Sequence, residues 1–280
     1  MNKFKMPVLP AVLALCILSS CGDYGENKQT SVIRHQTVPS VTFQTYATTS
    51  DITQTETVVT KVTEPPDVPK IIKVSSAGAF SDEEIPEEYY IEVEPVYQEP
   101  ELPAGCEITS LAMLLNYLGF DVDKVDLSDN YLKKNYDYTE NFYEAFVGNP
   151  KDSTGFGCYS PVIAESAQKY LEDMDSDFDV YDLTGSDFSD LFYYIANDKP
   201  VVVWASMSLV DVRYYNAWTM EANGEEVWWY ENEHCMLLTG YDTYNNTVTV
   251  CDPLKGEYTY DMYRFEEIYN QLEKQAITIY

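Results

Sequence analysis

The stretch QEPELPAGCEITSLAMLLNYLG, residues 98–119, decides the fold of the C-terminal part of this chain. Its second half places apolar residues at the three-and-four spacing of an amphipathic helix. These residues are Ile108, Leu111, Ala112, Leu115 and Leu118. Gly119 follows them, as is typical where a helix ends. We therefore predict a helix over residues 106–118 that begins at Cys106.

Cys106 stands where a helix can favour a reactive thiol. The unpaired N–H groups and the dipole at a helix N-terminus favour thiolate over thiol. Gly105, directly before it, would let a substrate backbone approach closely. Cys106 is thus a candidate nucleophile.

Two more helices and a sheet are expected after this one. Ser160 suits an N-cap and Pro161 the first helical position, so a second helix should run on through residue 171. Residues 186–196 suggest a third helix. The run VVVWAS at 201–206 is short, apolar and β-branched, which is typical of a buried strand.

Two further strands are predicted over residues 234–241 and 247–252, joined by the turn-prone stretch 242–246. Helices followed by an antiparallel sheet indicate an α+β fold. If Leu238 lies opposite Val248, one face of this hairpin is apolar. His234 then lies opposite Asp252 at the end of that face.

This register matters because the chain has only two histidines, and His35 lies in a polar segment near the N-terminus. A lone histidine is often a structural residue. A carboxylate beside His234 would instead fix its tautomer and stabilise the imidazolium, as base catalysis by histidine requires.

The same register places Cys235 opposite Cys251 on the other face of the hairpin. Residues facing each other across antiparallel strands lie within the range that a disulfide can close. Outside the cytoplasm such a pair could oxidise. Two buried free thiols that pack as small hydrophobic groups are the alternative.

A family resemblance supports the site. The residues that carry it are QEPELPAGCEITSLAMLLNYLG at 98–119, FVGNP at 146–150, TGFG at 154–157, KPVVVW at 199–204, HCMLLTGYD at 234–242 and DPL at 252–254. These blocks resemble, in order, the peptidases related to bacteriocin-leader (double-glycine) processing enzymes, in their stand-alone secreted, C39-like branch. The resemblance covers residues 98–280 and implies a papain-like fold, in which a helix carries the cysteine and an antiparallel sheet carries histidine and aspartate.

The resemblance implies that Cys106 is the nucleophile of a cysteine peptidase, His234 its base and Asp252 the acid that orients the base. Gln98 would match the glutamine that donates its amide to the oxyanion. The spacing between Gln98 and Cys106 is longer than is usual in papain-like enzymes, so a plain loop glutamine is the alternative. Double-glycine specificity is not implied, because this chain carries no transporter.

Two other functions fit the same residues. A papain-fold module without catalysis could bind peptide or cell-wall ligands, with the aromatic run 228–230 as a platform; those side chains could instead pack within a loop or line the cleft. Acyl or peptidyl transfer is the third possibility, because an amine as well as water can take a thioester.

The N-terminus predicts export. MNKFK, an apolar stretch over residues 6–18 and LSSC at 18–21 form a signal peptide rather than a membrane span. A cysteine directly after LSS resembles the lipobox of bacterial lipoproteins, which predicts lipid on Cys21; ordinary secretion with Cys21 free is the alternative. We expect a signal peptide over residues 1–20, a disordered Thr/Ser/Pro/Glu-rich tether over 21–90 and the peptidase domain over 91–280.

Charge and cysteine spacing limit the partners. The formal net charge is −30, from 17 basic and 47 acidic residues, so nucleic acid is excluded for want of a basic face. The acidic residues could attract cationic substrates or simply solvate the surface. No Cys-x-x-Cys pair occurs, and neither metal nor cofactor is predicted. We expect an extracytoplasmic monomer, held to the bacterial cell membrane only by its lipid, that acts on a peptide or protein.

Overall fold

The protein was analysed as a computed structural model that describes residues 85–280. The predicted signal peptide, Cys21 and nearly all of the predicted tether lie outside the described residues. Strand β1 (Glu88–Tyr90) pairs with a strand of the main sheet, so that sheet begins three residues before the expected domain start at residue 91. Within residues 85–280, no helix combines the length and hydrophobicity needed to cross a bilayer.

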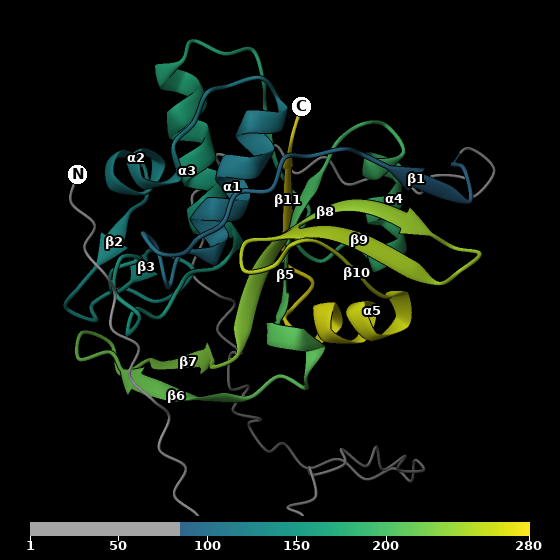
Figure 1. Ribbon diagram of the computed structural model, residues 1–280. Coiled ribbons are helices and arrows are strands. Elements are labelled where there is room, and N and C mark those ends of the chain that lie inside the picture. Colours follow the sequence, from purple (N-terminus) through teal and green to yellow (C-terminus); the bar gives the residue numbers. More distant parts are fainter. Residues whose placement is uncertain (1–84) are drawn as a thin grey trace, which may run out of the picture. The chain divides into compact units, whose positions relative to one another are not determined.

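Five α-helices and eleven strands make up the described part of the chain (Figure 1). The helices are α1 (Cys106–Tyr117), α2 (Lys124–Asn130), α3 (Ser160–Asp173), α4 (Leu191–Ile195) and α5 (Met262–Gln271). After β1, the strands are β2 (Lys134–Asn135), β3 (Phe146–Val147), β4 (Val180–Asp182), β5 (Val201–Ser206), β6 (Tyr214–Thr219), β7 (Glu226–Tyr230), β8 (Glu233–Asp242), β9 (Thr247–Asp252), β10 (Gly256–Asp261) and β11 (Ala276–Ile279).

The main sheet has seven strands in the order β10-β9-β8-β5-β11-β4, and β1 adds to the far half of β8. Every residue of β5 and nearly every residue of β8 is buried, because elements cover both faces of the sheet. Helix α1 contacts β8 and β5, and α5 lies on the opposite side of the sheet (Figure 1). The α+β expectation is confirmed.

The predicted helices are present, with one correction at a cap. Helix α1 ends at Tyr117 with Leu118 as its C-cap. Residues 186–196 form a short 3-10 turn followed by α4. The predicted N-cap of the second helix is wrong, because the N-cap of α3 is Tyr159 and Ser160 lies in its first turn. The Ser160 hydroxyl bonds the Thr184 hydroxyl at 2.8 Å, so it is not free to cap the helix.

The predicted register of the β8–β9 hairpin is wrong by two residues. The structure pairs Leu238 with Val250, whereas the apolar pattern favoured Val248. The turn is shorter than expected because Asp242 belongs to β8 and accepts the Asn245 backbone N–H at 2.8 Å. A β-bulge directly after Leu238 then shifts the pairing again. Up to Leu238 the error is even, so those side chains remain on their predicted face, whereas between the bulge and the turn the error is odd.

The predicted cysteine pair of this hairpin is also wrong. Cys251 lies opposite Leu237, so Cys235 and Cys251 do not face each other. Both are buried free thiols, and the thiol of Cys251 contacts the Val93 carbonyl oxygen at 3.6 Å. The alternative of two packed thiols therefore describes this hairpin.

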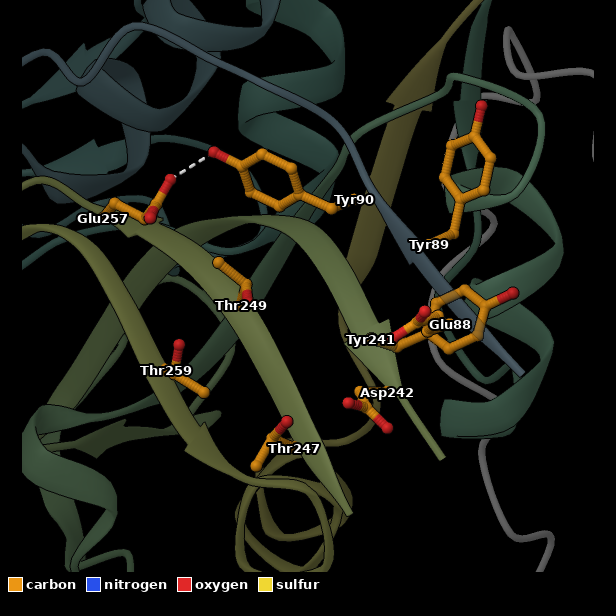
Figure 2. Close-up of a pocket in the computed structure, with 9 residues that line it drawn as sticks. All are labelled: Glu88, Tyr89, Tyr90, Tyr241, Asp242, Thr247, Thr249, Glu257 and Thr259. Atoms are coloured by element: carbon orange, nitrogen blue, oxygen red, sulfur yellow. Dashed lines mark hydrogen bonds between the residues drawn. The ribbon is translucent and has the colours of Figure 1, made fainter. Parts of the chain in front are cut away.

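An open groove of about 630 Å³ lies on the sheet where β1 meets β8, β9 and β10 (Figure 2). Its lining is Glu88, Tyr89, Tyr90, Tyr241, Asp242, Thr247, Thr249, Glu257 and Thr259. The Tyr90 hydroxyl bonds the Glu257 carboxylate across it. Neither Cys106 nor His234 lines this groove, so it is separate from the site described next.

Candidate active site

Cys106 meets the sheet at an edge that β9 leaves open. Strand β9 ends at Asp252, and beyond that point helix α1 takes its place beside β8. The Cys235 backbone N–H donates to the Cys106 sulfur at 3.5 Å, and the Ser110 hydroxyl donates to the Cys235 carbonyl at 3.2 Å. Cys106 and Ser110 are four residues apart and share one helix face. Side chains of α1 thus bond the backbone of the residue that follows His234.

His234 and Asp252 form a buried pair. The His234 Nε2 lies 2.7 Å from Asp252 Oδ1, and the two side chains are 3% and 0% exposed. The Leu254 backbone N–H also donates to Oδ1, at 2.8 Å. The second oxygen, Oδ2, lies 3.4 Å from the Tyr260 hydroxyl and 3.7 Å from the Lys255 ammonium. Both carboxylate oxygens therefore have partners.

These contacts determine the direction in which the pKa of Asp252 shifts. Burial alone would raise the pKa of Asp252, but the hydrogen bond from His234, the Leu254 N–H and the Lys255 charge outweigh it, and the pKa is lowered. Since Asp252 holds Nε2, Nδ1 is the nitrogen of His234 left for chemistry. The two-residue register error leaves both residues on one face, which explains how they still meet.

Gln98 also reaches this region. Its backbone N–H donates to the carbonyl of Pro253, the residue after Asp252, at 2.9 Å. Its side-chain amide donates to the Pro103 carbonyl at 2.9 Å. Within the described residues, its buried Oε1 has no hydrogen-bond partner. The predicted donation of this amide to an oxyanion remains a prediction.

Two buried glutamates flank the thiol on another side. Glu107 Oε1 accepts the Cys158 backbone N–H at 2.8 Å, while Oε2 lies 3.4 Å from the Cys106 sulfur, which donates to it. Glu233, the residue before His234, is 7% exposed. One ligand atom from each of Cys106, Glu107 and Glu233 lies within 4.8 Å of the others. Two carboxyl groups and a thiol thus share one small volume.

These neighbours keep the thiol protonated in this arrangement. Burial raises the pKa of Cys106 well above its usual range, and the charges of Glu107 and Glu233 add to the effect. Burial likewise raises the pKa of Glu107 to about 7 and that of Glu233 well above its usual range. Burial and the two carboxyl groups thus oppose the thiolate that the helix N-terminus favours.

A glycine and an aromatic ring close the carboxylate side. A Cβ at Gly157 would lie 2.5 Å from Glu107 Oε1 and 2.6 Å from a ring carbon of Trp229. Trp229 is buried and stacks on Tyr159, whereas Trp228 is 47% exposed. The aromatic run 228–230 therefore divides between packing near the thiol and solvent.

Glu107 and Glu233 were missed by the sequence analysis. Glu107 stands among the apolar positions of a helix whose first ten residues are all buried, and Glu233 opens a strand that is buried along its first nine. A charged residue at the buried end of two adjacent elements is the signal that could have found them.

The described part of the chain is similar to known proteins in sequence and in structure. A sequence profile of the C39-like peptidase family matches residues 90–277. The uncharacterized protein YvpB of Bacillus subtilis (strain 168) is 32% identical over 186 residues, which cover 64% of this chain and 70% of YvpB. The crystal structure of a Bacillus anthracis protein assigned as a C39-like peptidase is 32% identical, with a TM-score of 0.60 over 70% of this chain and 98% of that one.

Proposed function

Because this chain belongs to the C39-like peptidase family, we propose that it is a cysteine peptidase that cleaves peptide bonds through Cys106, His234 and Asp252. The proposal rests mainly on the buried 2.7 Å bond between His234 and Asp252. Cys235, the residue after His234, donates its backbone N–H to the Cys106 sulfur.

The chemistry follows the roles of these groups. His234 takes the thiol proton on Nδ1, and Asp252, bonded to Nε2, stabilises the imidazolium. The thiolate attacks the carbonyl carbon, and the Cys106 backbone N–H and the Gln98 amide receive the developing oxyanion. His234 returns its proton to the leaving amine, and water then hydrolyses the thioester.

Two movements are required for this reaction. In the structure the thiol donates to Glu107, so the sulfur must turn toward His234 before it ionises. Gln98 must likewise release the Pro103 carbonyl to present its amide. Substrate binding, which tightens catalytic hydrogen bonds, would supply both changes.

A thiol-directed suicide probe tests the proposal. Full-length protein should be labelled on one cysteine, and Cys106→Ala should lose that label. A peptide library should then be cleaved by the parent and not by Cys106→Ala, and transfer to added amines would identify an acyl transferase. Labelling that is unchanged in Cys106→Ala would refute Cys106 as the nucleophile.

A non-catalytic binding module is the second candidate, and one observation favours it. The thiol is buried and bonded to a carboxylate that raises its pKa, an arrangement that opposes nucleophilic attack. This function predicts a peptide or cell-wall ligand that binds equally well to the parent and to Cys106→Ala, with no cleavage by either.

We also propose that the protein is a surface lipoprotein, anchored through Cys21. The support is the signal-like sequence before it and LSS directly ahead of the cysteine. In a bacterial host, Cys21→Ala should appear in the medium or remain unprocessed instead of fractionating with membranes. Unchanged fractionation would contradict lipid attachment.

A further inference from the structure

A second cluster of chemically reactive side chains lies on the carboxylate side of Cys106. Three side chains with metal-ligand atoms meet there: Cys106 and Glu107 from α1, and Glu233 from β8. All three are at least nine-tenths buried. Their spacing along the chain carries no metal signature, because the third ligand comes from a different element.

An unpaired atom of Glu233 also indicates a ligand at this cluster. Its Oε1 atom is buried and, within the described part of the chain, has no hydrogen-bond partner. A buried carboxyl oxygen left unpaired is costly, so it usually marks a position where some other group belongs. The unpaired atom belongs to a side chain that meets both Glu107 and the Cys106 sulfur.

We propose that Cys106, Glu107 and Glu233 form a binding site for a divalent transition-metal ion of the zinc class. A tetrahedral zinc ion holds sulfur at about 2.3 Å and carboxylate oxygen at about 2.0–2.2 Å, so its ligand atoms lie roughly 3.5 Å apart. The 3.4 Å between Cys106 Sγ and Glu107 Oε2 already matches that separation. The carboxylate of Glu233 lies within 4.8 Å of both other ligand atoms, so a small rotation of its side chain would bring it to the same separation.

The ligand set selects the ion. A thiolate disfavours magnesium and calcium, which prefer oxygen ligands, and suits zinc or cobalt. Coordination would replace the thiol proton by a metal–sulfur bond and release that proton to solvent. Three protein ligands leave a fourth position for water.

Occupancy would block the proposed peptidase, and this consequence alone rests on the proposed function. A metal-bound sulfur facing the glutamates cannot turn toward His234. Chelation would restore the thiol, so the ion would act as a reversible inhibitor.

The rival arrangement is a metal held by Cys106 and His234. The two differ in which residue of β8 is needed, and the variants Glu233→Gln and His234→Ala separate them. Glu231→Gln makes the same substitution at an exposed residue two positions earlier. Cys106→Ser gives the baseline for metal held elsewhere in the full-length chain.

Zinc affinity, measured by competition with a chelator, tests the site without any assay of activity. The parent should bind one more equivalent than Cys106→Ser. Glu233→Gln should weaken that binding at least tenfold, whereas His234→Ala and Glu231→Gln should stay within about threefold. Magnesium should not compete.

Cobalt(II) provides a second readout. The parent should show a thiolate-to-cobalt charge-transfer band that is absent in Cys106→Ser and weakened in Glu233→Gln. Thermal unfolding should confirm that Glu233→Gln folds; if it does not, Glu107→Gln takes its place. No extra equivalent in the parent, or a loss in His234→Ala with none in Glu233→Gln, would overturn the site. Neither result bears on whether the protein cleaves peptides.

Discussion

Glu233 and His234 are consecutive residues of β8, directly before the residue whose backbone N–H contacts the Cys106 sulfur, and their side chains have contrasting surroundings. On one side, His234 and Asp252 form a pair in which both carboxylate oxygens have partners. On the other side, Glu107 and Glu233 bring two carboxyl groups together, and one buried oxygen remains unpaired. Successive residues of a strand point to opposite faces, which is how neighbours reach such different surroundings.

The contrast teaches that burial by itself does not determine what a carboxyl group does. Asp252 is fully buried, yet its pKa is lowered because histidine, a backbone N–H and lysine surround it. The pKa of Glu107 is raised to about 7, chiefly by burial, because the two backbone N–H groups and the thiol that donate to it carry no positive charge. The first pair is suited to orient a base, and the second to hold protons or a cation.

The largest effect expected is from His234→Ala. If the His234 side carries the chemistry, this variant should lower kcat/KM on a cleaved peptide on the order of 10³-fold or more. Glu107→Gln should lower it less, and His35→Ala, at the other histidine of the chain, should match the parent. Steady-state kinetics measures all three. A greater loss in Glu107→Gln than in His234→Ala would reverse the roles of the two regions.

A smaller loss is expected from Asp252→Asn, which keeps the shape of the side chain but removes its charge. The rate should fall on the order of 10²-fold, because the imidazolium loses its stabilising partner while the base itself remains. The same kinetics applied to this variant sharpens the comparison. A rate equal to that of the parent would show that the 2.7 Å bond is structural only.

Gly157→Ala tests the carboxylate side alone. Its new methyl group would collide with Glu107 Oε1 and with Trp229, so the free energy of unfolding should fall by about 1–3 kcal/mol. Gly185→Ala is the control, because a Cβ there has nothing within 4 Å and meets only backbone strain. Urea unfolding measures both. Equal losses in the two variants would mean that the space around Glu107 is not tight.

The smallest effect expected is on the pH dependence of stability. Because the folded-state pKa of Asp252 is lowered, its contribution is present above the unfolded-state pKa of about 4 and is lost as pH falls through the folded value. Between about pH 5 and pH 2, Asp252→Asn should therefore lose less stability than the parent. Asp177→Asn, at an exposed aspartate, should behave as the parent does. Unfolding curves at several pH values decide, and parallel losses would contradict the lowered pKa.

Local sequence patterns were enough to predict the helix and the strands that position the site. The three-and-four spacing after Cys106 determines where α1 begins, and the β-branched run at 201–206 is β5, residue for residue. His234 and Asp252 were paired correctly through a register that is wrong by two residues. Face alternation has a period of two, so an even error preserves the face and moves only the position along it.

The remainder depends on contacts between distant segments. The β-bulge lies between Leu238 and Gly240, and this interior glycine is the one sequence signal that could have indicated it, whereas the apolar pattern alone could not. Glu107 meets Glu233 only because α1 occupies the edge that β9 leaves open. The Cys106 thiol in turn donates to Glu107, so its orientation also depends on this packing. Such features require the tertiary arrangement, which no linear spacing contains.

The lack of a side chain at Gly157 limits which residues relatives can carry at the neighbouring positions 107 and 229. Its missing side chain leaves a single space that the Glu107 carboxylate and the Trp229 ring occupy together. Any larger residue there displaces both, and a shorter acid or a smaller ring would leave that space unfilled. Substitutions at 107 and 229 should therefore be inherited together, whereas glycine at 157 should persist even where Glu107 is replaced, because its positive φ of 156° favours glycine whatever the space around it.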